Sequence, residues 1–232
     1  MRNILVFLGG VAVFVIIAVG LYQWLGGPSV KVTEPAVIAT SSKTTGAKAA
    51  RGDAASVRAD DFAMGSSSAP VTVIEYASLT CPHCASFHND VLPKVKSEYV
   101  DKGKVRLVYR DFPLDGAALR ASMLARCAGR ERFFAFLGIL FKRQDTWAKS
   151  ADPINALGQI AALGGMDRKQ FLACLQNPKI EKRVLESRME AENAFAVDST
   201  PSFIVNGRKI SLGTSFGNFK AIIDPIIAAA GK

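Results

Sequence analysis

Two cysteines with two residues between them form the most chemically specific pattern of this chain, Cys81-Pro82-His83-Cys84. Thiols at positions i and i+3 can close a disulfide when the first lies at a helix N-terminus, so the pair can cycle between dithiol and disulfide. Zinc binding would need a second pair of ligands at close spacing, and c-type haem attachment would need a histidine where this chain has Ala85. The motif therefore predicts thiol–disulfide exchange.

The position expected for Cys81 favours its thiolate form. A β-branched strand is expected at 71–77, followed by a turn and by a helix that begins at Pro82. Unpaired backbone N–H groups and the positive end of the helix dipole would then face the sulfur of Cys81. Pro82 has no N–H to lose, and the imidazole of His83 can donate a hydrogen bond or add charge. Sites of this kind bring a cysteine pKa from about 8.5 to about 3.5–7.5.

A lowered pKa at Cys81 sets the redox direction. Once the pKa lies below the ambient pH, each further unit stabilises the reduced form by about 1.4 kcal/mol. For a two-electron couple this makes the disulfide about 30 mV more oxidising. The motif therefore predicts a disulfide donor rather than a reductant.

The composition argues against several other classes of function. The formal net charge is +9, but the basic residues are spread along the chain, so no nucleic-acid-binding face is expected. The only histidines are His83 and His88, and we expect no bound metal. We interpret His88, four residues after Cys84, as a surface helix residue rather than a proton-handling group. An even number of cysteines, four, suits an oxidising compartment.

The N-terminal part predicts a protein held at a membrane. Residues 4–25 carry no charge and, as a helix, would span roughly 33 Å, enough to cross a bilayer core. The segment is longer than a signal-peptide core and does not end in a small-residue cleavage site. We therefore expect 1–25 to be an uncleaved inner-membrane anchor, the alternative being a cleaved signal and a soluble periplasmic protein. Residues 26–60 are expected to be a disordered linker.

The remaining residues, 61–232, are expected to form one α/β domain. Further strands are expected at 104–110, 202–205 and 209–212, with Asn206-Gly207 as a hairpin turn between the last two. A helix is expected over 82–99, with a kink at Pro93. Other helices are expected at 117–129, 131–147, 152–163, 168–176, 179–195 and 216–230. The order is strand–helix–strand, a helical block at about 115–195, and then hairpin–helix.

Three features of this order resemble the thioredoxin superfamily and, within it, the DsbA family of periplasmic disulfide oxidoreductases. They are the stretch VIEYASLTCPHC at Val73–Cys84, the pair Thr200-Pro201 before a strand, and the helical block between them. The resemblance covers about residues 62–232, and Pro-His between the cysteines is the dipeptide associated with the DsbA branch. It implies a thioredoxin fold with a helical-domain insertion.

The resemblance also implies roles for individual residues. Cys81 would be the nucleophile and Cys84 the buried partner, while Pro201 would be cis and lie opposite the dithiol. Glu75 matches the acidic residue beneath the active site and is a candidate proton relay to Cys84, the alternative being a half-buried strand residue that pairs with a lysine. The redox-active Cys81–Cys84 disulfide would be the only redox group, with no separate cofactor.

Two departures from the family pattern affect the interpretation. Thr200 stands where the best-known oxidant of the family has valine, and threonine occurs there in isomerases and in many alphaproteobacterial-type DsbA proteins. This loop therefore leaves the choice between oxidase and isomerase open. The membrane tether is also atypical of a freely soluble oxidant.

Cys127 and Cys174 form a second pair within the helical block, 47 residues apart. As in a subgroup of DsbA-like proteins with a second disulfide, we expect them to pair if the chain is exported. The alternative is two buried free thiols in a helical core.

The expected function is the introduction of disulfides into unfolded exported polypeptides, with reoxidation by a DsbB-like membrane partner. The first alternative is an envelope isomerase or a dedicated thiol reductase with the same chemistry. The second is a non-catalytic metal carrier or chaperone with a thioredoxin fold. The absence of a separate dimerisation domain between the anchor and residue 61 favours the oxidase over the isomerase.

Overall fold

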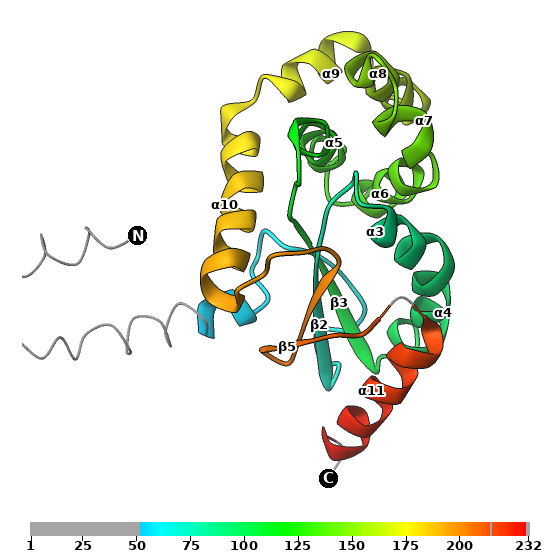
Figure 1. The fold of residues 1–232 in the computed structure, drawn as a ribbon, viewed down its shortest axis with the longest axis vertical. Coiled ribbons are helices and arrows are strands. Elements are labelled where there is room, and N and C mark those ends of the chain that lie inside the picture. The colour runs from blue at the N-terminus through cyan, green and yellow to red at the C-terminus, as the bar shows by residue number, and fades with distance from the viewer. Residues whose placement is uncertain (1–51, 214, 231–232) are drawn as a thin grey trace, which may run out of the picture. The chain divides into compact units, whose positions relative to one another are not determined.

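The computed structural model describes residues 52–213 and 215–230 of the chain (Figure 1). The membrane segment expected at 4–25 and the linker residues up to 51 lie outside this part. Among the described residues, no helix is both long enough and apolar enough to cross a membrane.

The strands of the described part form one mixed sheet. They are β1 (Phe62–Met64), β2 (Val71–Ala77), β3 (Val105–Asp111), β4 (Ser202–Val205) and β5 (Arg208–Ile210). Their order in the sheet is β1-β3-β2-β4-β5. The central pair, β2 and β3, is parallel, whereas β1 pairs with β3, β4 with β2 and β5 with β4 in antiparallel fashion. The thioredoxin-like α/β fold expected from the sequence is confirmed.

The helices follow the expected order. They are α3 (Pro82–Ser86), α4 (Leu92–Val95), α5 (Gly116–Cys127), α6 (Phe133–Lys142), α7 (Gln144–Ala148), α8 (Pro153–Leu163), α9 (Arg168–Leu175), α10 (Pro178–Phe195) and α11 (Phe216–Ala230). Two π-helical stretches, η1 (Phe87–Val91) and η2 (Lys96–Val100), flank α4. The helix expected over 82–99 is thus continuous in path but irregular around Pro93, whose missing N–H cannot take part in regular helical bonding.

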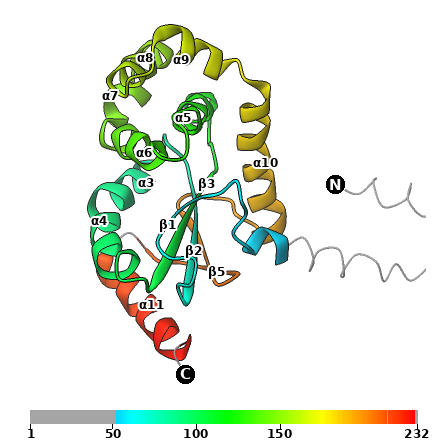
Figure 2. The ribbon, with the colours of Figure 1, turned by 180° about the vertical axis from the view of Figure 1, so that it is seen from behind.

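Both faces of the sheet are covered, which explains the uninterrupted apolar run in β2. Val71 and Val73 pack against the η1–η2 segment and α11, whereas Ile74 and Tyr76 pack against α10. Figures 1 and 2 show this arrangement, with α10 on one side of the sheet and α4 with α11 on the other. Because side chains alternate along a strand, Glu75 shares the face of Val73 and lies under η1.

The helical insertion, α5 to α9, covers one end of the sheet (Figure 1). Its core holds fully buried aromatic side chains, among them Phe133, Phe141, Trp147 and Phe171. This core is continuous with the buried cysteines Cys81 and Cys84. The insertion therefore lies directly against the part of the chain that carries the predicted chemistry.

The residues just before the expected domain boundary at 61 differ from the prediction. Residues 52–55 form a helical turn, and Ala54 is buried. The fully buried guanidinium of Arg110 donates hydrogen bonds to the backbone carbonyls of Ala54 and Ser56 and forms an ion pair with Asp61. A buried cation needs such partners, so residues 52–60 pack on the domain instead of belonging to a free linker.

Candidate active site

Cys81 is the N-cap residue of α3, with Pro82 as the first helical residue. Its backbone is extended (φ −81°, ψ 120°), and the residue is 6% exposed. The Cys81 thiol donates a hydrogen bond to the backbone carbonyl of Thr200 over 3.2 Å. In this structure Cys81 and Cys84 are free thiols.

The surroundings lower the pKa of Cys81 to about 5. The largest cause is a hydrogen bond from the Cys84 thiol to the Cys81 sulfur, which outweighs the opposite effect of burial. The Thr200 side chain and the backbone N–H groups of Cys84 and His83 also favour the thiolate. The His83 side chain itself is exposed, so its contribution in this structure comes through its backbone.

Cys84 has the opposite environment. Its side chain is fully buried, and burial raises the pKa of its thiol far above the usual value. The hydrogen bond to Cys81 and the nearby negative charge of Glu75 raise this pKa further. The two thiols of one motif therefore differ strongly in acidity: the surroundings favour the thiolate of Cys81 and the protonated thiol of Cys84.

The Thr200-Pro201 loop lies against the dithiol, and its peptide bond is cis. Ser202, at the start of β4, stabilises the loop by donating a hydrogen bond to the carbonyl of Ser199 over 2.8 Å. Because β4 pairs with β2, the sheet brings a loop near residue 200 beside a motif near residue 81.

Gln144 contributes to this site and was not predicted from the sequence. Its buried side-chain amide donates hydrogen bonds to the carbonyls of Leu79 and Cys81, over 2.8 and 3.0 Å. The residue begins α7, so the helical insertion directly holds the turn that leads into α3. A glutamine in a polar stretch gives no sequence signal for this role.

The surface position expected for His88 is wrong. The side chain is 4% exposed, and its Nε2 lies 3.1 and 3.0 Å from the two carboxylate oxygens of Glu75. Glu75 is fully buried, and its partner is this histidine instead of a lysine. His88 follows the buried Cys84 by four residues, so the two side chains share the face of the helix that packs on β2.

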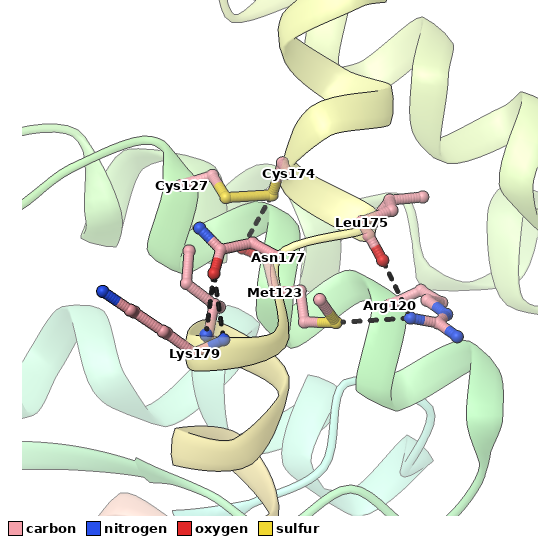
Figure 3. Close-up of a disulfide and its surroundings, with 8 residues drawn as sticks. Arg120, Met123, Cys127, Cys174, Leu175, Asn177 and Lys179 are labelled. Atoms are coloured by element: carbon pink, nitrogen blue, oxygen red, sulfur yellow. Dashed lines mark hydrogen bonds between the residues drawn. A yellow bond between two sulfur atoms is a disulfide. The ribbon is translucent and has the colours of Figure 1, made fainter.

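Cys127 and Cys174 are joined by a disulfide that connects α5 to α9 (Figure 3). Close to this bond, Arg120 donates a hydrogen bond to the carbonyl of Leu175 over 3.0 Å, a second link between the same helices. Asn177 then caps α10 by accepting hydrogen bonds from the backbone N–H groups that follow it. The disulfide therefore lies in a part of the insertion where further hydrogen bonds hold α5, α9 and the start of α10 in place.

Comparisons with known proteins agree with this geometry. The family model described as thioredoxin matches residues 58–225. The solved structure of alpha-DsbA1 from Wolbachia pipientis has 33% sequence identity and a TM-score of 0.69, and the match covers 75% of this chain and 94% of that one. The chain belongs to the thioredoxin superfamily, in its DsbA-like branch.

Sequence relatives in this family have names that describe disulfide chemistry. A putative protein-disulfide oxidoreductase of Rickettsia felis is 36% identical over 174 residues, which are 75% of this chain and 60% of that protein. A probable disulfide bond formation protein D of Bacillus anthracis is 30% identical over 172 residues, 69% of this chain and 76% of that protein. The chain thus matches less than two thirds of the length of the Rickettsia relative.

Proposed function

We propose that this chain is a thiol–disulfide exchange enzyme that introduces disulfides into exported polypeptides. The observation that carries the proposal is the difference between the two thiols of one motif: the pKa of Cys81 is lowered to about 5, and that of Cys84 is raised. The family of the chain and the names of its relatives support the same chemistry.

The proposed reaction starts from the oxidised enzyme. A substrate thiolate attacks the Cys81 sulfur, the Cys81–Cys84 bond breaks, and its electron pair goes to Cys84, which takes up a proton. A second substrate thiolate attacks the substrate sulfur of this mixed disulfide, and Cys81 leaves as a thiolate. Because a thiol of low pKa is a good leaving group, the second step favours release of oxidised substrate.

The proposed roles of the surrounding residues follow from their positions. The cis Thr200-Pro201 loop lies against the Cys81 sulfur, where it can hold the substrate backbone. Glu75, buried near Cys84, is the proposed proton relay to that sulfur. Cys127 and Cys174 have a proposed structural role.

The direction of transfer follows from the lowered pKa of Cys81. A thiolate that persists at neutral pH stabilises the reduced enzyme. Each unit by which the pKa of Cys81 lies below the ambient pH makes the couple about 30 mV more oxidising. We therefore infer an oxidase rather than an isomerase or a reductase. A DsbB-like membrane protein would reoxidise it. The proposed location is the periplasmic side of the inner membrane, with residues 4–25 as the anchor.

The central test is Cys81→Ser in the full-length chain. We expect oxidation of a reduced two-cysteine peptide to fall to the uncatalysed rate. Cys84→Ser, which has no disulfide of its own to donate, should still form a mixed disulfide through Cys81 when the peptide is supplied in its disulfide form, because no second enzyme thiol can resolve that bond. Quenched time points resolved by mass spectrometry would show both outcomes. Near-wild-type oxidation by the Cys81→Ser variant would refute the assignment of the nucleophile.

A glutathione titration tests the direction. We expect the reduction potential of the Cys81–Cys84 couple to lie well above the value of about −270 mV that is typical of a thioredoxin reductant. A potential near that value would contradict the oxidase and favour a reductase.

A further inference from the structure

His88 is held in one orientation beneath the active site. Its Nε2 points at both carboxylate oxygens of Glu75, at 3.1 and 3.0 Å. The imidazole stacks on the ring of Phe141, with centroids 4.1 Å apart, and meets the ring of Tyr109 edge-on. A histidine with these contacts can donate to the carboxylate in either its neutral or its charged form.

His88 also lines a pocket of about 400 Å³. Its lining is mainly apolar, and exposed residues such as Pro93, Lys96 and Gly138 form part of it, so it opens to the surface. A Cβ placed on Gly138 would meet no atom within 4 Å, which shows how open this wall is. His88 is therefore a buried side chain that adjoins both a surface pocket and the carboxylate of Glu75.

Glu75 in turn lies near the dithiol. Its negative charge is among the causes that raise the pKa of Cys84, so the carboxylate lies within electrostatic range of that sulfur. The order of groups from the surface inward is thus the pocket, His88, Glu75 and Cys84. Each neighbouring pair in this order is joined by a hydrogen bond, by a shared cavity wall or by a direct electrostatic effect.

We propose that His88 is a positioning residue that aims the carboxylate of Glu75 at Cys84 and replaces, from the pocket, the proton that Glu75 passes to that sulfur. The inference rests on the proposed exchange reaction and deepens it. It assigns a proton route to one half-reaction, the one in which Cys84 becomes the leaving group.

The proton balance of this step is as follows. The substrate thiolate bonds to the Cys81 sulfur, the Cys81–Cys84 bond breaks, and its electron pair goes to Cys84. The proton shared by His88 and Glu75 moves through the carboxylate to the Cys84 sulfur. The pair then holds one proton fewer and regains it from solvent through the pocket. The enzyme disulfide is the oxidant in this step and becomes reduced, so no other oxidant is needed.

The ionisable groups around His88 come from several elements. Glu75 faces it from β2, Tyr109 from β3, and Lys96 lines the same pocket from η2. Lys96 is paired with Asp101 over 2.7 Å, so its charge is partly compensated. Cys84 completes the set through Glu75. Of these groups, Glu75 alone is hydrogen-bonded to the imidazole in the described residues.

The first test compares His88→Gln with the wild type in the full-length chain. Glutamine can still donate a hydrogen bond to Glu75 but cannot carry the proton. We expect formation of the mixed disulfide between the oxidised enzyme and a one-cysteine peptide to slow by about tenfold. This is less than the rate enhancement that a general acid or base in direct contact with the reacting atom usually provides. The pH profile of this rate, corrected for peptide thiolate, should also lose one ionisation.

A double variant separates proton transfer from a packing role. If His88 acts through Glu75, adding His88→Gln to Glu75→Gln should change neither the rate nor its pH profile further. A packing role would reduce the rate again in the double variant, and this result would overturn the proposal, as would a His88→Gln profile that superimposes on the wild type.

A measurement on the unmodified chain covers the case in which these variants fail to fold. Because the chain has only two histidines, ¹⁵N-histidine labelling gives one set of ring signals each for His83 and His88. We expect the ring nitrogen signals of His88 to differ between the oxidised and the reduced enzyme at the same pH, because the two forms differ in the proton on Cys84 that Glu75 and His88 would supply. Identical His88 signals in both forms would contradict the proposal. If the wild type fails to oxidise the peptide at all, the proposed function fails first, independently of His88.

Discussion

The two cysteine pairs of this domain lie at opposite ends of their helices. Cys81 caps the N-terminus of α3, whereas Cys127 is the last residue of α5 and Cys174 lies in the last turn of α9. A helix N-terminus stabilises a negative charge and a C-terminus disfavours it. The first pair is present as free thiols of very different acidity, and the second as a closed disulfide.

This comparison shows that burial alone does not decide the chemistry of a cysteine. Cys81 and Cys174 are 6% and 5% exposed, so burial does not separate them. The hydrogen bond from Cys84, together with Thr200 and the backbone N–H groups around the Cys81 sulfur, makes the difference.

Removal of the second pair tests this division most strongly. We expect Cys127→Ala/Cys174→Ala to lower the free energy of unfolding by about 4 kcal/mol, because opening a 47-residue loop restores entropy to the unfolded chain. The exchange rate with a two-cysteine peptide should stay near that of the wild type. Denaturant unfolding and peptide oxidation, measured on the same preparations, would check both expectations. A large change in exchange rate would show that the second pair also takes part in the chemistry.

Much of the active-site framework could be predicted from local sequence. The strand at 71–77 and the helix start at Pro82 were expected from β-branching and from the position of proline, and both are present. The Asn206-Gly207 turn has positive φ at both residues, 45° and 81°, as this dipeptide favours. These features depend on residues close in the chain, which explains why the sequence reveals them.

Other parts depend on contacts between distant residues. The edge strand β1 has three residues, too few to show a period of two. The roles of Gln144 and His88 arise only when α7 and η1 reach Leu79 and Glu75, and no local pattern reports this. The cis bond at Pro201 was expected from the family resemblance and not from the residues themselves.

Gln144 offers a smaller test, because it joins the insertion to the dithiol. We expect Gln144→Leu to lower the free energy of unfolding by about 2 kcal/mol, because two buried carbonyls lose their donor. Gln170→Leu, which removes an exposed glutamine from the capping box of α9, is the matched control and should cost about 1 kcal/mol or less. Equal losses in the two variants would mean that Gln144 does not tie the insertion to the active-site turn.

A third test is a pH dependence that the first pair has and the second lacks. The pKa of Cys81 is lowered to about 5, below the value of about 8.5 for an unfolded chain. Between these two values the unfolded state binds more protons at this sulfur than the folded state. The reduced protein is therefore stabilised above this window, and the stabilisation is lost as the pH falls toward 5. The slope is at most about 1.4 kcal/mol per pH unit, and contact with water reduces it.

Cys81→Ser provides the reference for this last test, because it removes the titrating sulfur and leaves Cys127–Cys174 closed. Unfolding of the reduced wild type and of this variant between about pH 5 and pH 8 should give curves that diverge as the pH rises. Thiolate absorbance of the wild type should show a midpoint near 5, the value to which the surroundings bring the pKa of Cys81. Parallel unfolding curves would mean that the helix N-terminus and the Cys84 thiol do not stabilise the Cys81 thiolate, and the contrast between the two pairs would then need another cause.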